Sequence, residues 1–266
     1  MQTSIQAMLV GCVVALWSAA AHAAPEAFSH ATLDRILAAH VRDGSVDYEG
    51  IRRTDAAALD EYVASLATAR PDAMTPAERL AFWLNAYNAL VISAIVKGVA
   101  PQEAAGRAAF FYGRKFDVAG RSRTLIDIEN NVIREVFRDP RIHFALVCGS
   151  KGCPLLRPSA YAGDSLDAVL DEETRRFIND PSRVKLDRDR RVVRVSSIFQ
   201  WYRKDFAGSD QALLQYLARY LPAEDQQALA GGTWRVEFID YDWTLNGTRP
   251  RVPQADKVSS PDAWGN

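Results

Sequence analysis

The segment from Thr75 to Gly98 constrains the fold more than any other part of this sequence. It opens Thr75-Pro76-Ala77-Glu78, in which Thr and Glu suit the two halves of a capping box and Pro suits the first helical position. The residues that follow, to Lys97, are mainly apolar on every side of a helix, and Gly98 ends the pattern. A helix that is apolar all round is usually buried. The sequence therefore predicts a central helix with the rest of the chain packed around it.

Two amide side chains interrupt this helix. Asn85 and Asn88 lie about 60° apart on the helical wheel, so both are expected inside the protein. Buried amides must find hydrogen-bond partners, which in turn fixes what packs against the helix. Asn85 is therefore a candidate catalytic residue, and Asn88 and the neighbouring Tyr87 are candidate binding residues.

Shorter patterns of apolar residues and caps divide the rest of the chain. Helices outnumber strands, and the strands come late and in hairpins, which favours an α+β fold over regular βαβ alternation. We expect a helix-rich single domain with a small, mainly antiparallel sheet. The other expected helices are 28–40, 55–69, 124–138, 165–177, a short one from about 197, and 211–220. The expected strands are 46–48, 142–147, 184–186, 192–195 and 234–239, with a strand and turn in 110–123.

The first 23 residues contain no Asp, Glu, Lys or Arg, and they include an apolar stretch over residues 8–17. That stretch is too short for a comfortable membrane span, and Ala21 and Ala23 match the small residues before a signal-peptidase site. We expect residues 1–23 to be a signal peptide cleaved near Ala23, 24–247 to form one globular domain, and 248–266 to be a disordered tail. The mature protein would be periplasmic or secreted. The alternatives are an uncleaved anchor and, less well matched, a lipoprotein signal.

The net charge of −1 gives no large field of one sign, which argues against nucleic acid as a partner. Beyond the N-terminal stretch we see no further apolar run long enough to span a membrane. The sequence also lacks a phosphate-binding Gly loop, a metal-binding His pair on a helix and a Gly-x-Ser-x-Gly turn. The expected partner is a small molecule or a protein, with no nucleic acid, no membrane span, no metal and no cofactor.

The segment 143–154 carries both cysteines that follow the signal peptide. Cys148 and Cys153 are separated by four residues, two of them glycines, so a small disulfide loop can close. An oxidising compartment favours that disulfide over a free thiol nucleophile or inert burial. A zinc site is disfavoured, because five extended residues place His143 ~16 Å from Cys148 and on the opposite face of the expected strand. The same geometry weakens a direct pair of His143 with Cys148.

Other polar residues near this segment are candidates for a site. His143 interrupts an otherwise apolar strand, so we expect it to be buried with a polar partner from another element, and either Asn of the central helix could serve. Arg141 and Arg157 flank the segment and are either solvated surface charges or binding residues for an anionic group. Asp242 follows the last expected strand, where it either caps a turn, orients a histidine or pairs with an arginine.

Five blocks of sequence, in order along the chain, carry a further signal: 81–90 (AFWLNAYNAL), 124–129 (TLIDIE), 139–148 (DPRIHFALVC) with 153–157 (CPLLR), 198–202 (IFQWY) with 205–206 (DF), and 240–246 (DYDWTLN). Together they resemble the family known as domain of unknown function 547, found in bacteria and plants. The blocks span nearly the whole mature domain, which makes the resemblance specific. The family name implies a domain without an established activity. One departure is Val147, where the family often has a polar residue such as Asn.

A buried helix followed by a His-bearing strand is also similar to the core of papain-like and transglutaminase-like enzymes, by fold-level analogy alone. Those enzymes have a nucleophilic Cys at the start of the helix, where this chain has Asn85, so Cys148 or Cys153 would have to serve. The favoured hypothesis is an exported, non-catalytic binding or accessory protein with a Cys148–Cys153 disulfide. The alternatives are a thiol-dependent hydrolase or transferase using either cysteine with His143, and a thiol–disulfide oxidoreductase, for which C-x4-C is an unusual spacing.

Overall fold

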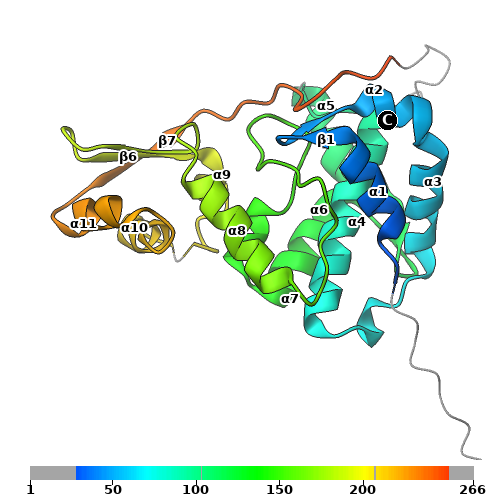
Figure 1. The fold of residues 1–266 in the computed structure, drawn as a ribbon, viewed down its shortest axis with the longest axis horizontal. Helices are drawn as coiled ribbons and strands as arrows, with labels where there is room; N and C mark the ends of the chain where they lie inside the picture. The colour runs from blue at the N-terminus through cyan, green and yellow to red at the C-terminus, as the bar shows by residue number, and fades with distance from the viewer. Residues whose placement is uncertain (1–27, 103, 207, 252–266) are drawn as a thin grey trace, which may run out of the picture.

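The structure of the chain is a computed structural model that describes residues 28–102, 104–206 and 208–251. It has the expected helix-rich α+β fold with small sheets (Figure 1). The longer helices are α1 (Ala31–His40), α2 (Tyr48–Thr54), α3 (Ala56–Ser65), α4 (Pro76–Val96), α8 (Leu166–Ile178), α10 (Asp210–Ala218) and α11 (Ala223–Ala230).

Short helical segments and strands complete the fold. The segments are η1 (Leu66–Thr68), η2 (Pro71–Ala73), α5 (Ala104–Ala108), η3 (Ala109–Gly113), α6 (Leu125–Asp127), η4 (Ile128–Arg134), α7 (Glu135–Phe137), η5 (Pro140–Phe144) and α9 (Ser197–Trp201). The strands are β1 (Val41–Arg42), β2 (Ser45–Val46), β3 (Phe116–Val118), β4 (Arg121–Arg123), β5 (Val184–Asp187), β6 (Val192–Ser196) and β7 (Arg235–Ile239).

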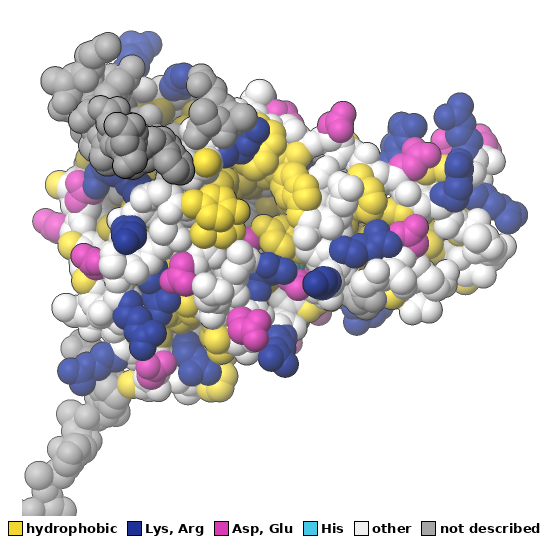
Figure 2. Space-filling view, turned by 180° about the vertical axis from the view of Figure 1, so that it is seen from behind, with side chains coloured by type: hydrophobic (Ala, Val, Ile, Leu, Met, Phe, Trp, Pro, Cys, Tyr) yellow, Lys and Arg dark blue, Asp and Glu magenta, His cyan; other side chains and the backbone are white. Residues whose placement is uncertain are grey.

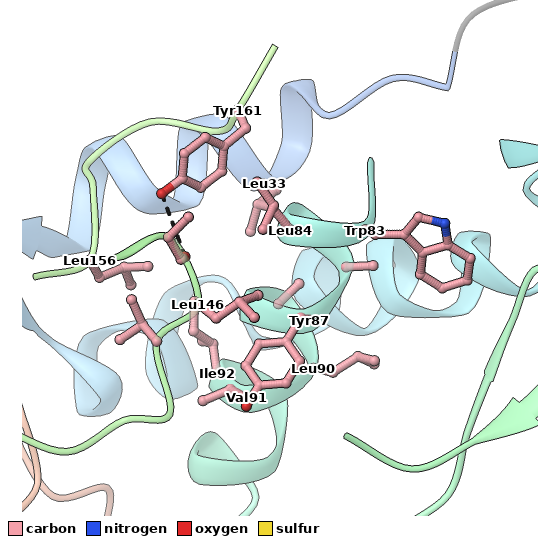
Figure 3. Close-up of a cluster of buried hydrophobic side chains, with 14 of the residues drawn as sticks. Leu33, Trp83, Leu84, Tyr87, Leu90, Val91, Ile92, Leu146, Leu156 and Tyr161 are labelled. Carbon is pink, nitrogen blue, oxygen red and sulfur yellow. Dashed lines mark hydrogen bonds between the residues drawn. The ribbon is translucent and has the colours of Figure 1, made fainter. Parts of the chain in front are cut away.

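The predicted central helix is α4, which forms the middle of the larger core. It starts with the expected capping box: the Glu78 N–H donates to the Thr75 hydroxyl (3.3 Å), and the Thr75 N–H donates to the Glu78 carboxylate (2.9 Å). Every residue from Leu80 to Val96 is buried. Figure 3 shows Leu33 of α1, Leu146 and Tyr161 gathered around its apolar side chains.

Among the described helices, α4 has the length and composition of a membrane span, so the expectation that no further apolar run is long enough was wrong on those two criteria. However, 94% of its most apolar window is buried inside the protein. An apolar helix at the centre of a protein core is buried in this way, because other elements cover its whole circumference. The burial of α4 therefore fits a core helix.

A second, smaller core forms the narrow end of the molecule, shown at the left of Figure 1. Here β5, β6 and β7 pair in that order, β5 with β6 antiparallel and β6 with β7 parallel. The other two sheets are the antiparallel pairs β1–β2 and β3–β4. Phe144 of η5 packs in the second core, whereas Ile142 and Ala145 beside it pack in the first. The η5 segment therefore joins the two cores.

Residues 142–147 do not form the predicted strand, because the chain is in a 3₁₀ helix, η5, from Pro140 to Phe144. Asp139 caps this helix by accepting a hydrogen bond from the Arg141 N–H (2.9 Å), and Pro140 occupies its first position. An Asp-Pro pair is a helix-start signal, and here it outweighs the apolar run that follows. Because His143 lies in this turn, the His-bearing strand of a papain-like core is not found in the described residues.

The two ends of the chain extend beyond the described part. The predicted signal peptide, residues 1–23, lies outside the described residues, as do residues 252–266 of the predicted tail. The first residues of that tail are bound to the domain: the Thr248 N–H donates to the Val46 carbonyl (2.9 Å), and the Arg251 N–H donates to the Glu49 carboxylate (2.8 Å). The packed chain therefore continues past residue 247.

Candidate functional site

A pocket of about 250 Å³ lies where the two cores meet. Figure 2 shows apolar side chains gathered in the hollow between the broad and narrow parts of the molecule. Two aromatic side chains of the pocket are well exposed, Tyr112 at 65% and Trp201 at 49%. The lining also includes Glu129, His143 and both cysteines. Its aromatic residues are Tyr87, Phe111, Tyr112, Trp201, Tyr202, Tyr241 and Trp243.

Two larger hollows lie elsewhere on the described surface. One, of about 760 Å³, is bordered by Phe28, His30 and Glu78, and the other, of about 630 Å³, by Lys151 and Arg183. The carboxylates that line these two hollows are all exposed. Because ligand sites combine an apolar lining with a few convergent polar groups, the smaller pocket is the candidate site.

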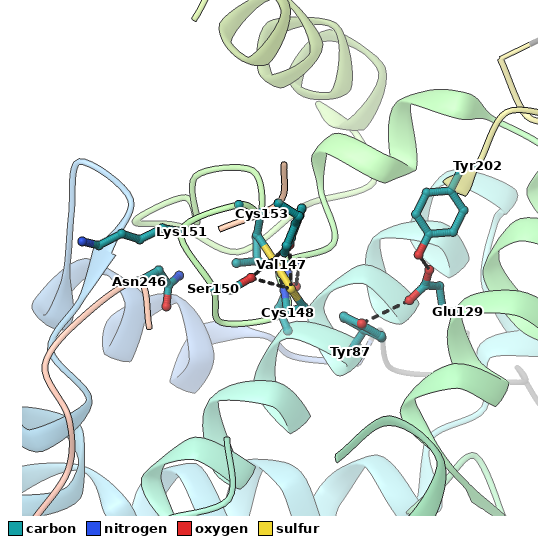
Figure 4. The surroundings of a disulfide bond; sticks show 12 residues. Tyr87, Glu129, Val147, Cys148, Ser150, Lys151, Cys153, Tyr202 and Asn246 are labelled. Atoms are coloured by element: carbon teal, nitrogen blue, oxygen red, sulfur yellow. Dashed lines mark hydrogen bonds between the residues drawn. A yellow bond between two sulfur atoms is a disulfide. The ribbon is translucent and has the colours of Figure 1, made fainter. Parts of the chain in front are cut away.

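Glu129 is the buried carboxylate of this pocket, with 5% of its surface exposed. It lies in η4, a π-helical stretch, and π-helical turns occur frequently at functional sites. The Tyr87 hydroxyl donates to its carboxylate (3.2 Å), and the Tyr202 hydroxyl donates to the other oxygen (Figure 4). Burial raises the pKa of the Tyr87 and Tyr202 phenols well above the ordinary value for tyrosine, and the negative charge of Glu129 raises it further. Both tyrosines therefore keep the protons that they donate.

His143 and Asp205 form a second polar group of the pocket lining. The His143 Nε2 lies 2.7 Å from the Asp205 carboxylate, and its ring stacks on Tyr202 with centroids 3.9 Å apart. Arg134 holds the same carboxylate through two bonds, at 2.7 and 3.1 Å. Burial works against ionisation of Asp205, but the hydrogen bonds from His143 and Arg134 prevail and lower the pKa of Asp205 below its ordinary value. An ionised carboxylate therefore fixes the orientation of the imidazole.

The cysteines form the predicted disulfide, with Cα atoms 6.2 Å apart (Figure 4). Gly149 makes the turn that the loop needs, with φ of +82°. The Tyr241 hydroxyl lies 3.1 Å from the Cys148 sulfur and 3.0 Å from the Cys153 sulfur, and accepts a hydrogen bond from Ser150 (3.0 Å). Burial raises the pKa of Tyr241. In the described residues, no hydrogen bond joins His143 to either sulfur, so the direct thiol–imidazole pair is not formed.

The two buried amides of α4 serve the backbone instead of the pocket. Asn85 donates to the Tyr161 carbonyl (2.8 Å) and accepts from its N–H (2.9 Å). Asn88 donates to the Ala145 carbonyl (2.9 Å) and accepts from the Val147 N–H (2.9 Å). The prediction that one of them would partner His143 is wrong, because both are bonded to backbone groups and the ring of His143 faces Asp205. The side chain of Val147 is buried in the first core, which suits its apolar character.

The charged candidates have partners within the protein. Arg141 pairs with Asp139 (2.8 Å), Asp167 (2.8 Å) and Asp171 (2.9 Å), so it is neither a free surface charge nor open to an anion.

The other two charged candidates also lie outside the pocket lining. Arg157 pairs with the buried Glu173 (3.3 Å). Asp242 accepts hydrogen bonds from the Thr244 N–H (2.9 Å) and hydroxyl (2.7 Å), as a residue that caps a turn does. Within the described ranges, no three His, Cys, Asp or Glu side chains converge as metal ligands.

The five sequence blocks, which are far apart in the chain, converge on the pocket. Reasoning from individual residues did not single out Glu129, Tyr202 or Asp205, although each lies in one of these blocks. A polar or aromatic residue within an apolar block was the available signal, but only the fold shows which of them meet. The contributions to the lining are Tyr87 from 81–90, Glu129 from 124–129, His143 and Cys148 from 139–148, Trp201 and Tyr202 from 198–202, and Tyr241 and Trp243 from 240–246.

Comparison with known proteins agrees with the sequence blocks. The family model described as "protein of unknown function, DUF547" matches residues 71–178, which include α4, Glu129, His143 and the disulfide loop. No curated protein and no solved structure gives a significant match to the chain. The matched segment contains the central helix and three of the five converging blocks, and over this segment the chain is similar to the DUF547 family.

Proposed function

We propose that this protein is an exported, non-catalytic binding or accessory protein that holds a small molecule in the pocket between its two cores. The observation that carries the proposal is the convergence of seven aromatic side chains and one buried carboxylate on a single pocket. Aromatic walls with a few placed polar groups are the usual composition of a ligand site. The exposed rings of Tyr112 and Trp201 give a ligand apolar surface to cover.

The disulfide supports binding over thiol chemistry. A cysteine acts as a nucleophile only as its thiolate. Cys148 and Cys153 are bonded to each other, so neither offers a thiolate. The imidazole that would activate a thiol is turned to Asp205 instead. Cys153 is only 3% exposed, which also disfavours exchange with an external dithiol.

The test uses three probes of similar size and different charge: benzylamine, benzyl alcohol and benzoate. We expect at least one of them, at millimolar concentration, to shift the NMR signals of the Trp201 and Trp243 indole N–H groups. Trp83 and Trp234 belong to the two cores and serve as internal controls. Trp201→Ala should weaken binding several-fold by removing a wall of the pocket. If none of the three probes moves the pocket signals selectively, the proposed function is wrong.

A second candidate function, acid–base catalysis in the same pocket, is favoured by the His143–Asp205 pair, because an oriented imidazole can transfer protons to a bound substrate. Hydrolysis of p-nitrophenyl acetate distinguishes the two functions. Under the binding proposal, the wild-type rate equals that of His143→Gln. A wild-type rate about tenfold higher, unaffected by iodoacetamide, would favour a thiol-independent hydrolase.

A further inference from the structure

Of the two well-buried glutamates among the described residues, Glu129 and Glu173, only Glu129 has no ion-pair partner. Glu173 has the same 5% exposure and pairs with Arg157 (3.3 Å) and Arg176 (3.5 Å). Glu129 receives two phenol hydrogen bonds, but no described Lys, Arg or His nitrogen lies within ion-pair distance of it. Arg134, in the same helical segment, acts on Glu129 only from beyond ion-pair distance, because its guanidinium is bound to Asp205.

A buried carboxylate without an ion-pair partner is unfavourable unless something completes its surroundings. Two phenol donors supply partial positive charge to Glu129 but no full charge. Glu129 also belongs to the lining of the pocket, so a molecule that enters can reach its surroundings. The group that best completes such a site is a cation carried by the ligand.

The aromatic walls suit the same kind of ligand. Trp201, Tyr241 and Trp243 form one cluster, with ring centroids 4.6 to 5.9 Å apart. The faces of aromatic rings attract cations. One ring of this cluster already does so: the Arg107 guanidinium lies 4.4 Å from the centroid of Trp243. The pocket therefore combines a carboxylate with ring faces, the two features that recognise organic cations.

We propose that the pocket binds a small organic cation, an ammonium or guanidinium group on an apolar body, with its charge paired to Glu129 and its body against the aromatic walls. This inference rests on the proposed function, because it names the class of ligand that the same pocket takes.

The experiment compares the three probes in the wild-type protein and in two variants. In the wild type we expect benzylamine, protonated at pH 7, to bind about tenfold more tightly than benzyl alcohol, and benzoate to bind most weakly. Glu129→Gln should lower the affinity for benzylamine about tenfold and leave that for benzyl alcohol within about threefold. Glu135→Gln, the same substitution at an exposed neighbouring position, should change neither. Added salt should weaken benzylamine binding alone.

The outcomes separate the inference from the proposed function. If benzyl alcohol binds as tightly as benzylamine, or Glu129→Gln leaves benzylamine binding unchanged, the cation inference is overturned while the pocket still binds. If no probe binds, the proposed function fails first. Should Glu129→Gln not fold, the order of the three probes and its salt dependence in the wild-type protein decide the inference by themselves.

Discussion

Buried polar residues in this protein are satisfied in different ways, and the way decides what each can do. Asn85 and Asn88 bond backbone atoms of packed segments, so their role is to hold those segments in place. Glu173 is neutralised by two arginines. Asp205 is neutralised by one arginine and also orients a histidine. Glu129 is bonded only by phenols, which leaves it open to a charged ligand.

Asp205→Asn should lower the free energy of unfolding at pH 7 by about 1–3 kcal/mol, because the partners of the carboxylate, Arg134 and His143, lose a charged acceptor. The lowered pKa of Asp205 sets the pH dependence. The native-state pKa lies below the unfolded one, so the stabilisation is complete above about pH 4 and is lost as the pH falls further. Urea unfolding of wild type and variant at pH 7, 5 and 3 measures the difference.

Two outcomes of that series would contradict the assignment. One is a stability difference that grows as the pH falls from 5 to 3, since protonation of Asp205 should remove what the variant has already lost. The other is an equal effect of Glu135→Gln, which alters an exposed carboxylate whose nearest cation, Arg138, is 3.7 Å away, and which should cost under about 0.5 kcal/mol.

At the scale of elements, the site depends on how η5 is held against α4. The η5 segment ends at Phe144, and the chain beyond it must pass from one core to the other. Asn88 bonds the Ala145 carbonyl and the Val147 N–H, so one side chain of α4 fixes the exit of η5. The position of His143 in the pocket depends on this attachment, because His143 lies on the turn that is held.

Asn88→Ala should destabilise the protein by about 2–4 kcal/mol, because it leaves a buried N–H and a buried carbonyl with reduced or no hydrogen bonding. Chemical denaturation followed by circular dichroism measures this loss. Asn131→Ala is the matched control, since Asn131 is exposed and bonds only Asp127, and its effect should stay below about 0.5 kcal/mol. Equal effects of the two variants would mean that Asn88 does not anchor η5.

At the scale of the whole molecule, the pocket exists where the two cores meet, because residues of both cores form its lining. Its lining takes Tyr87 and Leu146 from the first core and Ile198 from the second. The disulfide loop, whose cysteines pack in the first core, is held by strand-like contacts to residues 242–245, including Lys151 N–H to the Thr244 carbonyl (2.7 Å). The sulfurs are thus built into the wall of the pocket.

We predict that the protein exported to a bacterial periplasm begins at Ala24 and carries no free thiol. Intact mass spectrometry should show no alkylation before reduction and two alkyl groups after it, one for each of Cys148 and Cys153. Reduction should lower the free energy of unfolding by about 2 kcal/mol, since the closed loop is short. Cys153→Ser should make Cys148 alkylate without reductant. Two reactive thiols in the unreduced wild type would contradict the disulfide, and an unprocessed N-terminus would contradict the cleavage site.

Much of the fold could be predicted because its signals are local. The capping box at Thr75 and the apolar circumference of α4 specify a buried helix within one segment. The apolar run at 142–147 was wrongly predicted as a strand, because it shows neither the alternation of a strand nor the spacing of a helix. The preceding Asp139 and Pro140 start a 3₁₀ helix there instead. The α2 helix and α11 were missed because their apolar faces are short.

The sequence by itself determined the central helix, the α+β class and the likeness to the DUF547 family, and it favoured the closure of Cys148 with Cys153 that the structure shows. Each of these follows from residues close together in the chain or from the order of whole blocks. Only the tertiary structure decided that His143 would meet Asp205, 62 residues away, and that Glu129 would meet Tyr87 and Tyr202, 42 and 73 residues away. The physical reason is that local patterns say which side chains are buried, whereas the packing of the two cores decides which of those buried groups face each other.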